Sequence, residues 1–170
     1  GSAQALELWS DFVGKHRVTV ILGDNCTDAD ISEQVGNFKD GALIFLKTVI
    51  DPQRFGVPVF DNVEKPEKII KIEEKPGSPQ NNFAVTGLYI YDNKVFDYIK
   101  TNKPSNRGEL EITDVNNRYI DSGKMRWAQL EGFWSDAGTF ESLYRTNVYW
   151  TRKRLGSSKE KELTNFGEKQ

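Results

Sequence analysis

Apolar residues along the chain follow two spacings, one typical of helices and one typical of strands. Leu6, Trp9 and Val13 recur every three or four residues, which predicts a helix over residues 3–14. The run over residues 18–22 is continuously apolar or β-branched, as in a strand buried on both faces. Because helices and strands alternate, we expect an α/β fold with parallel strands as the leading arrangement.

The same two spacings continue to about residue 155. Pro58 indicates that one strand lies at a sheet edge, because proline cannot donate to a strand ladder. Beyond this point the sequence is polar, so we expect one domain over residues 1–155 and a flexible tail over residues 156–170. The other expected helices lie around residues 31–38, 95–99, 112–119 and 140–155. Thr139 is the expected N-cap of the last of them. The other expected strands lie at residues 42–50, 57–60, 68–72, 84–91 and 125–130.

The composition narrows the classes of partner. The chain has 23 basic and 25 acidic residues and a formal net charge of -2, which argues against binding to a nucleic-acid backbone. Cys26 is the single cysteine, so no disulfide can form within the chain and a reducing compartment is favoured. No segment approaches the roughly 18 consecutive apolar residues of a membrane-spanning helix. We therefore expect a soluble, cytoplasmic protein with neither a nucleic-acid nor a membrane partner.

Two aspartates lie at predicted junctions between a strand and a helix. Asp24 follows the strand at 18–22 in L-G-D-N, and Asp136 precedes the last helix in W-S-D-A-G-T. Open α/β sheets bind their ligands beyond the carboxyl ends of the strands. Each aspartate alone is also explained as a cap or turn residue. Together they could hold one hard cation, with substrate phosphates completing its shell.

Two other segments allow both a structural and a functional interpretation. Glu73, Glu74 and Lys75 offer two carboxylates and an ammonium group where a strand ends, although composition alone favours a solvated surface run. Gly87 lies inside the strand over 84–91, which indicates either a bulge or the close approach of another backbone or a ligand.

Six motifs occur in an order that resembles one enzyme family. They are L-G-D-N at 22–25, D-P-Q-R-F-G-V at 51–57, E-E-K-P at 73–76, F-A-V-T-G-L-Y at 83–89, R-G-E-L-E-I-T-D at 107–114 and W-S-D-A-G-T at 134–139. Over roughly residues 3–150 they resemble the sugar-1-phosphate nucleotidylyltransferases. The resemblance implies a Rossmann-like nucleotidyltransferase fold with a mixed sheet. It also implies a reaction in which a sugar-1-phosphate attacks the α-phosphate of a nucleoside triphosphate and pyrophosphate leaves.

The resemblance implies roles for single residues. Asp24 and Asp136 match the family's Mg²⁺-binding aspartates, and Arg107 matches an arginine directed at the sugar phosphate, so these are the implied catalytic residues. The guanidinium group of Arg107 suits an oxyanion because it is planar and permanently charged. Glu74 matches an acceptor for a sugar hydroxyl and Lys75 a donor to the phosphate. The implied contacts to the sugar-1-phosphate or nucleotide sugar are Gly56, Glu74, Lys75, Val85, Tyr89 and Arg107.

One family motif has no counterpart in this sequence. In the family the nucleotide-binding loop, G-x-G-x-R followed by a proline-lysine motif, precedes the matched segments. This chain begins with Gly1 and Ser2 rather than methionine, so we expect either a processing scar or the middle of a longer gene product. The amides of that loop cradle the triphosphate, so we expect an amino-terminally truncated chain that does not make nucleotide sugars alone.

Two alternatives to an enzyme follow from this departure. The chain could be a non-catalytic truncated paralogue that serves as a sugar-phosphate-binding or assembly module, or the basic helix over 145–154 could be a contact surface. The missing strand of the family fold would lie beside residues 18–22 and leave an apolar edge open. We therefore expect a homodimer or a complementing chain as partner.

Overall fold

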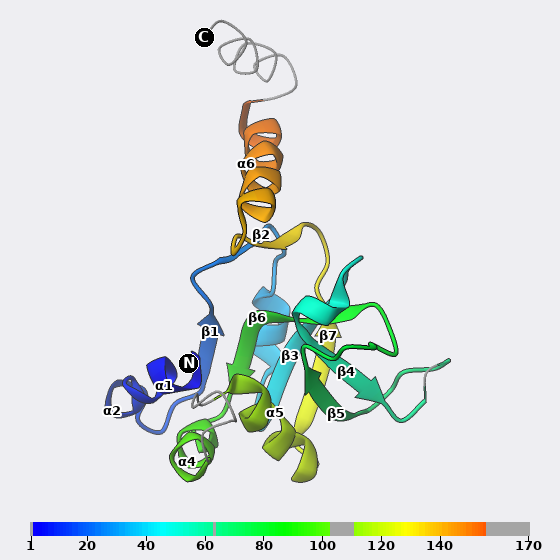
Figure 1. The fold of residues 1–170 in the computed structure, drawn as a ribbon. Coiled ribbons are helices and arrows are strands. Elements are labelled where there is room, and N and C mark those ends of the chain that lie inside the picture. The colour runs from blue at the N-terminus through cyan, green and yellow to red at the C-terminus, as the bar shows by residue number, and fades with distance from the viewer. Residues whose placement is uncertain (1, 63, 103–110, 156–170) are drawn as a thin grey trace, which may run out of the picture.

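The chain folds into a mixed α/β structure whose elements follow the two spacings of its sequence (Figure 1). The computed structural model describes residues 2–62, 64–102 and 111–155, so the predictions for Arg107 and for the tail lie outside the described residues. The helices are α1 (Ser2–Glu7), α2 (Ser10–Val13), α3 (Ser32–Asn37), the 3₁₀ helix η1 (Pro52–Arg54), α4 (Lys94–Thr101), α5 (Ile112–Asp121) and α6 (Phe140–Leu155). The strands are β1 (Val18–Ile21), β2 (Asn25–Thr27), β3 (Ala42–Thr48), β4 (Gly56–Phe60), β5 (Ile69–Glu74), β6 (Phe83–Tyr91), β7 (Met125–Gln129) and β8 (Trp134–Asp136).

Six strands form one mixed sheet around β6. Their order is β5-β4-β6-β3-β7, and β1 also pairs with β6. β6 is antiparallel to β1, β3 and β4, whereas β3 and β7 are parallel. The expected parallel arrangement is therefore wrong for most of the sheet, because an apolar run reports burial on both faces and not strand direction. The mixed sheet implied by the resemblance is present.

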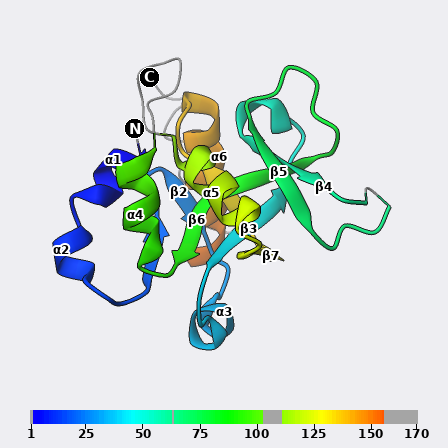
Figure 2. The same cartoon turned by 90° about the horizontal axis from the view of Figure 1, so that it is seen from below.

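Alternating side chains of the central strands supply cores on both faces of the sheet. In β3, Ala42, Ile44 and Leu46 join one core, while Leu43 and Phe45 join the other. Residues of α1, α4 and α5 complete the first core, and the segment around α3 packs on the second. Figure 2 shows these three helices on one side of the sheet and α3 on the opposite side. Both faces are covered, which explains the continuous apolar run of β3.

β1 differs from its prediction because one of its faces is uncovered. Val18 and Val20 pack partly against the first core, whereas Thr19 is exposed and Ile21 is 56% exposed. The prediction of a strand buried on both faces is therefore wrong for β1. Among the described residues, no strand pairs with the edge of β1 that faces away from β6.

β4 lies between β5 and β6, so the prediction that Pro58 marks an edge strand is wrong. β4 pairs with β6 at Gly56, which lies opposite Val85. Two residues later, the Pro58 carbonyl accepts a hydrogen bond of 2.7 Å from Asn81 Nδ2. At Pro58 the hydrogen-bond partner of β4 is thus the Asn81 side chain and not the backbone of β6. The missing N–H of proline therefore interrupts no backbone bond to β6.

The predicted first helix is divided into α1 and α2. Leu6 and Val13 are buried as predicted, but Trp9 is 59% exposed. Trp9 lies between the two helices with a non-helical backbone (φ -93°, ψ 1°), so helical spacing no longer places it with the other two. Its ring instead meets Phe12 edge-on, with 5.9 Å between the ring centroids.

α6 stands out from the sheet (Figure 1), and aromatic and charged contacts hold it through residues of its second half. Phe133 stacks on Tyr149, with 3.9 Å between the ring centroids. The Asp28 carboxylate accepts hydrogen bonds from Lys153 Nζ and the Tyr149 hydroxyl, which together hold the pKa of Asp28 well below its usual range. None of the helices in the described ranges has the length and apolar character needed to cross a membrane.

The start of α6 confirms its predicted cap. Thr139 Oγ1 accepts a hydrogen bond of 3.1 Å from the Ser142 N–H, and Ser142 Oγ accepts one of 3.0 Å from the Thr139 N–H. These reciprocal bonds satisfy amides that the first helical turn would otherwise leave unpaired. They also fix the backbone just after Asp136.

Ile44→Ala tests whether β3 lies between two packed layers. Ile44 is fully buried, so removal of its side chain should leave a cavity and lower the free energy of unfolding by roughly 2–5 kcal/mol. Ile50 is 92% exposed, so Ile50→Ala should change that free energy by less than about 0.5 kcal/mol. Urea unfolding followed by circular dichroism measures both, and equal losses would contradict the placement of β3.

Candidate functional site

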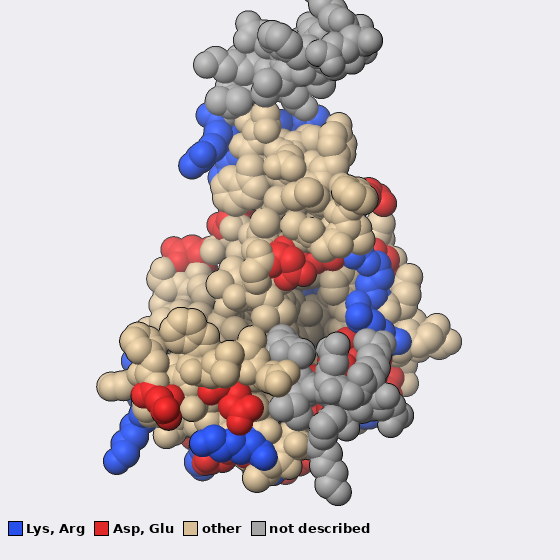
Figure 3. All heavy atoms as spheres, turned by 60° about the vertical axis from the view of Figure 1, so that its left-hand side comes forward, with Lys and Arg blue, Asp and Glu red and all other residues tan. Residues whose placement is uncertain are grey.

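A cavity of about 580 Å³ collects the predicted site residues that the structure describes. Its walls come from the ends of β1 and β5, the start of β4, the middle of β6, the start of α5, and β8. Figure 3 shows the surface hollowed below α6, with acidic and basic side chains at the rim. The predicted residues that line the cavity are Asp24, Gly56, Glu74, Lys75, Val85, Tyr89 and Asp136.

The two aspartates are joined by a two-stranded sheet that the sequence pattern did not predict. β2 pairs antiparallel with β8, which places Asn25 opposite Asp136. The Ala137 N–H also donates to the Asp24 carbonyl at 2.6 Å. These bonds bring together segments from opposite ends of the sequence. Strands of three residues are too short to show a periodic pattern, so the sequence carries no signal for them.

Gly87 lies at an irregularity of its strand, and the group that approaches it closely is a side chain and not the backbone or ligand that was expected. The register between β3 and β6 shifts beside it, as in a bulge. The Asn25 side chain also lies against it: Oδ1 accepts hydrogen bonds from the Gly87 N–H at 2.9 Å and from Trp134 Nε1 at 2.8 Å. Asn25 Nδ2 donates to Asp24 Oδ1 at 2.9 Å. A Cβ at Gly87 would lie 2.3 Å from Nδ2, so the approach requires glycine.

The two aspartate carboxylates border a common space beside Gly138. A Cβ at Gly138 would lie 3.2 Å from Asp136 Oδ2 and 3.7 Å from Asp24 Oδ2, so this glycine keeps the space between them open. Two carboxylate oxygens beside such a space fit Mg²⁺, which usually takes one or two protein carboxylates and completes its shell with water and phosphate. Within the described ranges, no group of three or more His, Cys, Asp or Glu residues could hold a metal ion.

Arg54 bridges two carboxylates next to this space. Its Nη2 lies 2.7 Å from Asp136 Oδ2, and its Nη1 lies 2.9 Å from Asp51 Oδ2. The guanidinium carbon lies 5.1 Å from the ring centroid of Phe55, which in turn contacts Trp134. The hydrogen bond to Asp51 and then the charge of Asp136 raise the pKa of Arg54, against the opposing effect of burial. The cavity therefore has a permanent positive charge in contact with one of its aspartates.

Glu74 is fixed by a hydroxyl on α5. Thr113 Oγ1 donates a hydrogen bond of 2.6 Å to Glu74 Oε2, and the second oxygen of a carboxylate can accept from a ligand. A Cβ at Gly56 would lie 3.6 Å from Glu74 Oε2, 3.6 Å from Thr113 Oγ1 and 3.2 Å from Ile72 Cγ2. Gly56 therefore allows the wall of the cavity to pack closely around the carboxylate.

Val85 and Tyr89 form an apolar part of the cavity wall on β6. Both are buried, at 9% and 4% exposed. Burial raises the pKa of Tyr89 well above its ordinary value, and the charges of Glu74 and Asp24 act in the same direction. The phenol therefore stays protonated and can donate a hydrogen bond.

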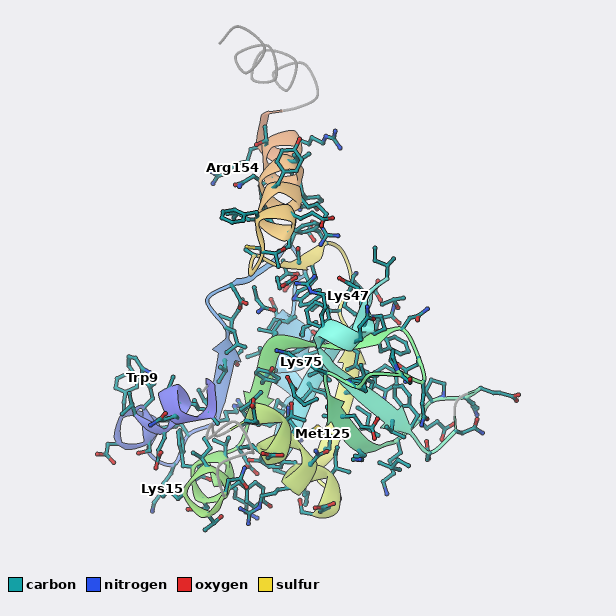
Figure 4. All side chains as sticks on the ribbon, viewed as in Figure 1. Trp9, Lys15, Lys47, Lys75, Met125 and Arg154 are labelled. Carbon is teal, nitrogen blue, oxygen red and sulfur yellow. The ribbon has the colours of Figure 1, made fainter. Side chains whose placement is uncertain are left out.

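Lys75 has the left-handed backbone conformation that is uncommon for residues other than glycine, with φ of 47°. Its N–H donates to the Phe55 carbonyl at 2.9 Å, which holds the turn after β5. Residues held in this way cluster at ligand sites. Figure 4 shows Lys75 near the middle of the molecule, and it lines the cavity together with Glu74. Glu73 instead pairs with Lys71 at 2.9 Å, so the charge run at 73–76 is part surface and part cavity wall.

Seven polar or aromatic residues of the cavity had no role assigned from the sequence: Asn25, Gln53, Arg54, Phe55, Glu111, Thr113 and Trp134. Each lies inside one of the six quoted motifs, and that membership is the signal that could have found them. Some of their contacts join different motifs, such as those of Asn25 with Gly87 and of Arg54 with Asp136, and no single motif contains both partners.

Known proteins resemble this chain in sequence. The family described as nucleotidyl transferase matches residues 1–153. A glucose-1-phosphate thymidylyltransferase from Xanthomonas campestris pv. campestris is 44% identical over 150 residues, which make up 85% of this chain and 50% of that protein. Another from Neisseria meningitidis is 41% identical over 85% of this chain and 51% of its own length. The chain therefore spans about half the length of the curated relatives it matches.

Solved structures share the fold. A Bacillus anthracis structure, assigned as a glucose-1-phosphate thymidylyltransferase in complex with a sucrose, superposes with a TM-score of 0.79 at 53% identity and covers 88% of this chain and 60% of its own. A UDP-glucose pyrophosphorylase complexed with UDP-glucose gives a TM-score of 0.78 at 22% identity, over 91% of this chain and 63% of its own. At that identity the likeness shows the fold alone. The nucleotidyltransferase fold implied by the resemblance is confirmed.

Gly87→Ala tests the contact between β6 and Asn25. The new methyl group should displace the Asn25 amide, break its bonds to Trp134 and Asp24, and destabilise the protein by roughly 1–3 kcal/mol. Thermal melting measures the effect, and the total tryptophan emission, to which Trp134 is one of four contributors, should shift as its partner leaves. Gly77→Ala is the control, because a Cβ there meets nothing within 4 Å. An unchanged melting temperature for Gly87→Ala would show that the amide contact is dispensable.

Proposed function

This chain belongs to the nucleotidyl transferase family, and we propose that its cavity binds a sugar-1-phosphate or the corresponding nucleotide sugar. For the whole protein we propose nucleotidyl transfer, in which an oxygen of the sugar-1-phosphate attacks the α-phosphate of a nucleoside triphosphate and pyrophosphate leaves. Relatives that are glucose-1-phosphate thymidylyltransferases support this class of substrate.

The observation that carries the proposal is that a pair of aspartates, a hydrogen-bond-accepting glutamate and a hydrogen-bond-donating lysine line the same cavity. Asp24 and Asp136 border a space that fits a hard cation, while Glu74 and Lys75 place a carboxylate and an ammonium group on the same wall. A sugar phosphate presents hydroxyl groups that donate and phosphate oxygens that accept. A site for a metal ion alone, or for an anion alone, would not need both kinds of group.

Different residues of the site would position the sugar and the phosphate. We propose that Glu74 orients the sugar by accepting from a hydroxyl, and that Lys75 and Arg107 donate to the phosphate. Asp24 and Asp136 would hold Mg²⁺, which when bound offsets the negative charge of the phosphates. Alignment of the reacting groups and charge neutralisation are the contributions of this chain, and neither requires a covalent bond to the protein.

A second candidate function is a binding or assembly module that pairs with another chain. The open edge of β1 favours it, because strand edges pair readily with other strands. We propose a homodimer joined at this edge, and a cytoplasmic location that suits the single cysteine.

Glu74→Gln should weaken glucose-1-phosphate binding about tenfold, because it removes the charge that accepts the sugar hydroxyl while keeping the size of the side chain. Isothermal titration calorimetry measures the affinity. Glu73→Gln is the matched control: it makes the same chemical change one residue earlier, where the carboxylate pairs with Lys71. Equal effects of the two substitutions would contradict the role of Glu74, and a chain that binds no sugar phosphate would favour the assembly module.

Light scattering at micromolar concentration should show a dimer if two β1 edges pair. Ile21→Lys should then shift the protein to a monomer, because a charge on an edge strand opposes pairing with another strand. Ile50→Lys makes the same change at a residue that is 92% exposed and distant in sequence from β1, so it should leave the dimer intact. A monomer with a cooperative melt before any substitution would contradict pairing through β1.

A further inference from the structure

Arg54 lies where two cavities meet. A second cavity, of about 250 Å³, shares Arg54, Phe55, Trp134 and Asp136 with the larger one. The side chain of Arg54 is 32% exposed, whereas that of Asp136 is 15% exposed. The guanidinium group therefore remains accessible from the cavities while it contacts the more buried carboxylate.

Arg54 contacts the same oxygen of Asp136 that faces the other aspartate. Nη2 lies 2.7 Å from Asp136 Oδ2, and this Oδ2, together with Asp24 Oδ2, borders the space beside Gly138. A divalent cation held by the two aspartates would draw on the same Asp136 carboxylate that Arg54 contacts. The positive charges of the cation and of the guanidinium group would then repel each other.

We propose that Arg54 is a positioning residue that competes with a divalent cation for Asp136 and thereby couples cation binding to the binding of an anionic ligand. Without an anion, Arg54 holds the Asp136 carboxylate in place and lowers the affinity for the cation. When a phosphate enters the cavity, its negative charge gives the guanidinium group a second partner, and the repulsion between the two cations falls.

Asp51 allows the guanidinium group of Arg54 to exchange Asp136 for a phosphate without leaving the cavity wall. It binds Arg54 through Nη1, at 2.9 Å, while Asp136 is bound through Nη2. Release of the bond to Asp136 therefore leaves the guanidinium group tethered at the cavity wall. By thermodynamic linkage, an anion that raises the affinity for the cation must have its own affinity raised by the cation to the same degree. The role proposed for Arg54 rests on the proposed function in one respect, which is that the anion is the sugar phosphate.

Mn²⁺ titration followed by electron paramagnetic resonance tests the competition, with Mn²⁺ in place of Mg²⁺ and no anion present. Arg54→Gln removes the competing charge and should bind Mn²⁺ about tenfold more tightly than the unsubstituted protein. Arg54→Lys keeps the charge but not the two-pronged geometry, so it should tighten Mn²⁺ binding distinctly less than Arg54→Gln does. Arg145→Gln is the matched control, because Arg145 lines the second cavity and not the first, and it should also stay within about threefold.

The coupling is measured by repeating the titration with glucose-1-phosphate. The anion should tighten Mn²⁺ binding to the unsubstituted protein about tenfold and to Arg54→Gln distinctly less. Unchanged or weaker Mn²⁺ binding by Arg54→Gln without the anion would overturn the proposal and leave Arg54 as a structural brace. Absence of glucose-1-phosphate binding would contradict the proposed function, whereas the titration without the anion still decides the competition.

A second measurement needs no loss of the arginine charge. The NMR signal of the Arg54 side-chain N–H, identified by its disappearance in Arg54→Lys, should shift when Mg²⁺ is added, because the bond to Asp136 is released. A signal that does not move at saturating Mg²⁺ would overturn the competition even if Arg54→Gln failed to fold.

Discussion

The amide of Asn25 is the contact on which the geometry of the cavity depends. Asn25 lies in β2, yet its side chain bonds Gly87 of the main sheet, Trp134 of β8 and the neighbouring Asp24. These bonds tie the small β2–β8 pair to the six-stranded sheet and orient one of the two carboxylates. The absence of a side chain at Gly87 is the condition for all of them, since a Cβ there would occupy the place of the amide. A glycine in one segment thus fixes a charged group in another.

Each carboxylate of the cavity has a partner that restricts it. Asp24 accepts from Asn25, Asp136 pairs with Arg54, and Glu74 accepts from Thr113. Such bonds reduce the entropy that would be lost if a free side chain were ordered on binding. They also place positive charge beside negative charge within one cavity, which suits a ligand with both hydroxyl and phosphate groups better than a purely apolar one.

The surrounding fold holds these carboxylates and their partners in fixed relative positions. β3 and β6 are packed on both faces, so the middle of the sheet is a stable base for the segments that end in the cavity. α6 begins just after Asp136 and is anchored through Tyr149 and Lys153 to Asp28, which follows β2. α6 and the aspartate pair are therefore both held by the segments of the same two short strands.

The sequence by itself determined the class of fold, most element positions and the residue types of the cavity, because these depend on local spacing and on short motifs. Asp24, Glu74, Lys75 and Asp136 could be proposed in this way, since each lies in a recognisable motif at the end of an element. Strand direction, the open face of β1 and the β2–β8 pair were decided by tertiary structure, because they depend on which segments become neighbours. The same holds for the contact of Arg54 with Asp136: hydrogen bonds between side chains distant in sequence follow from relative positions in space, and no local pattern of residues encodes those positions.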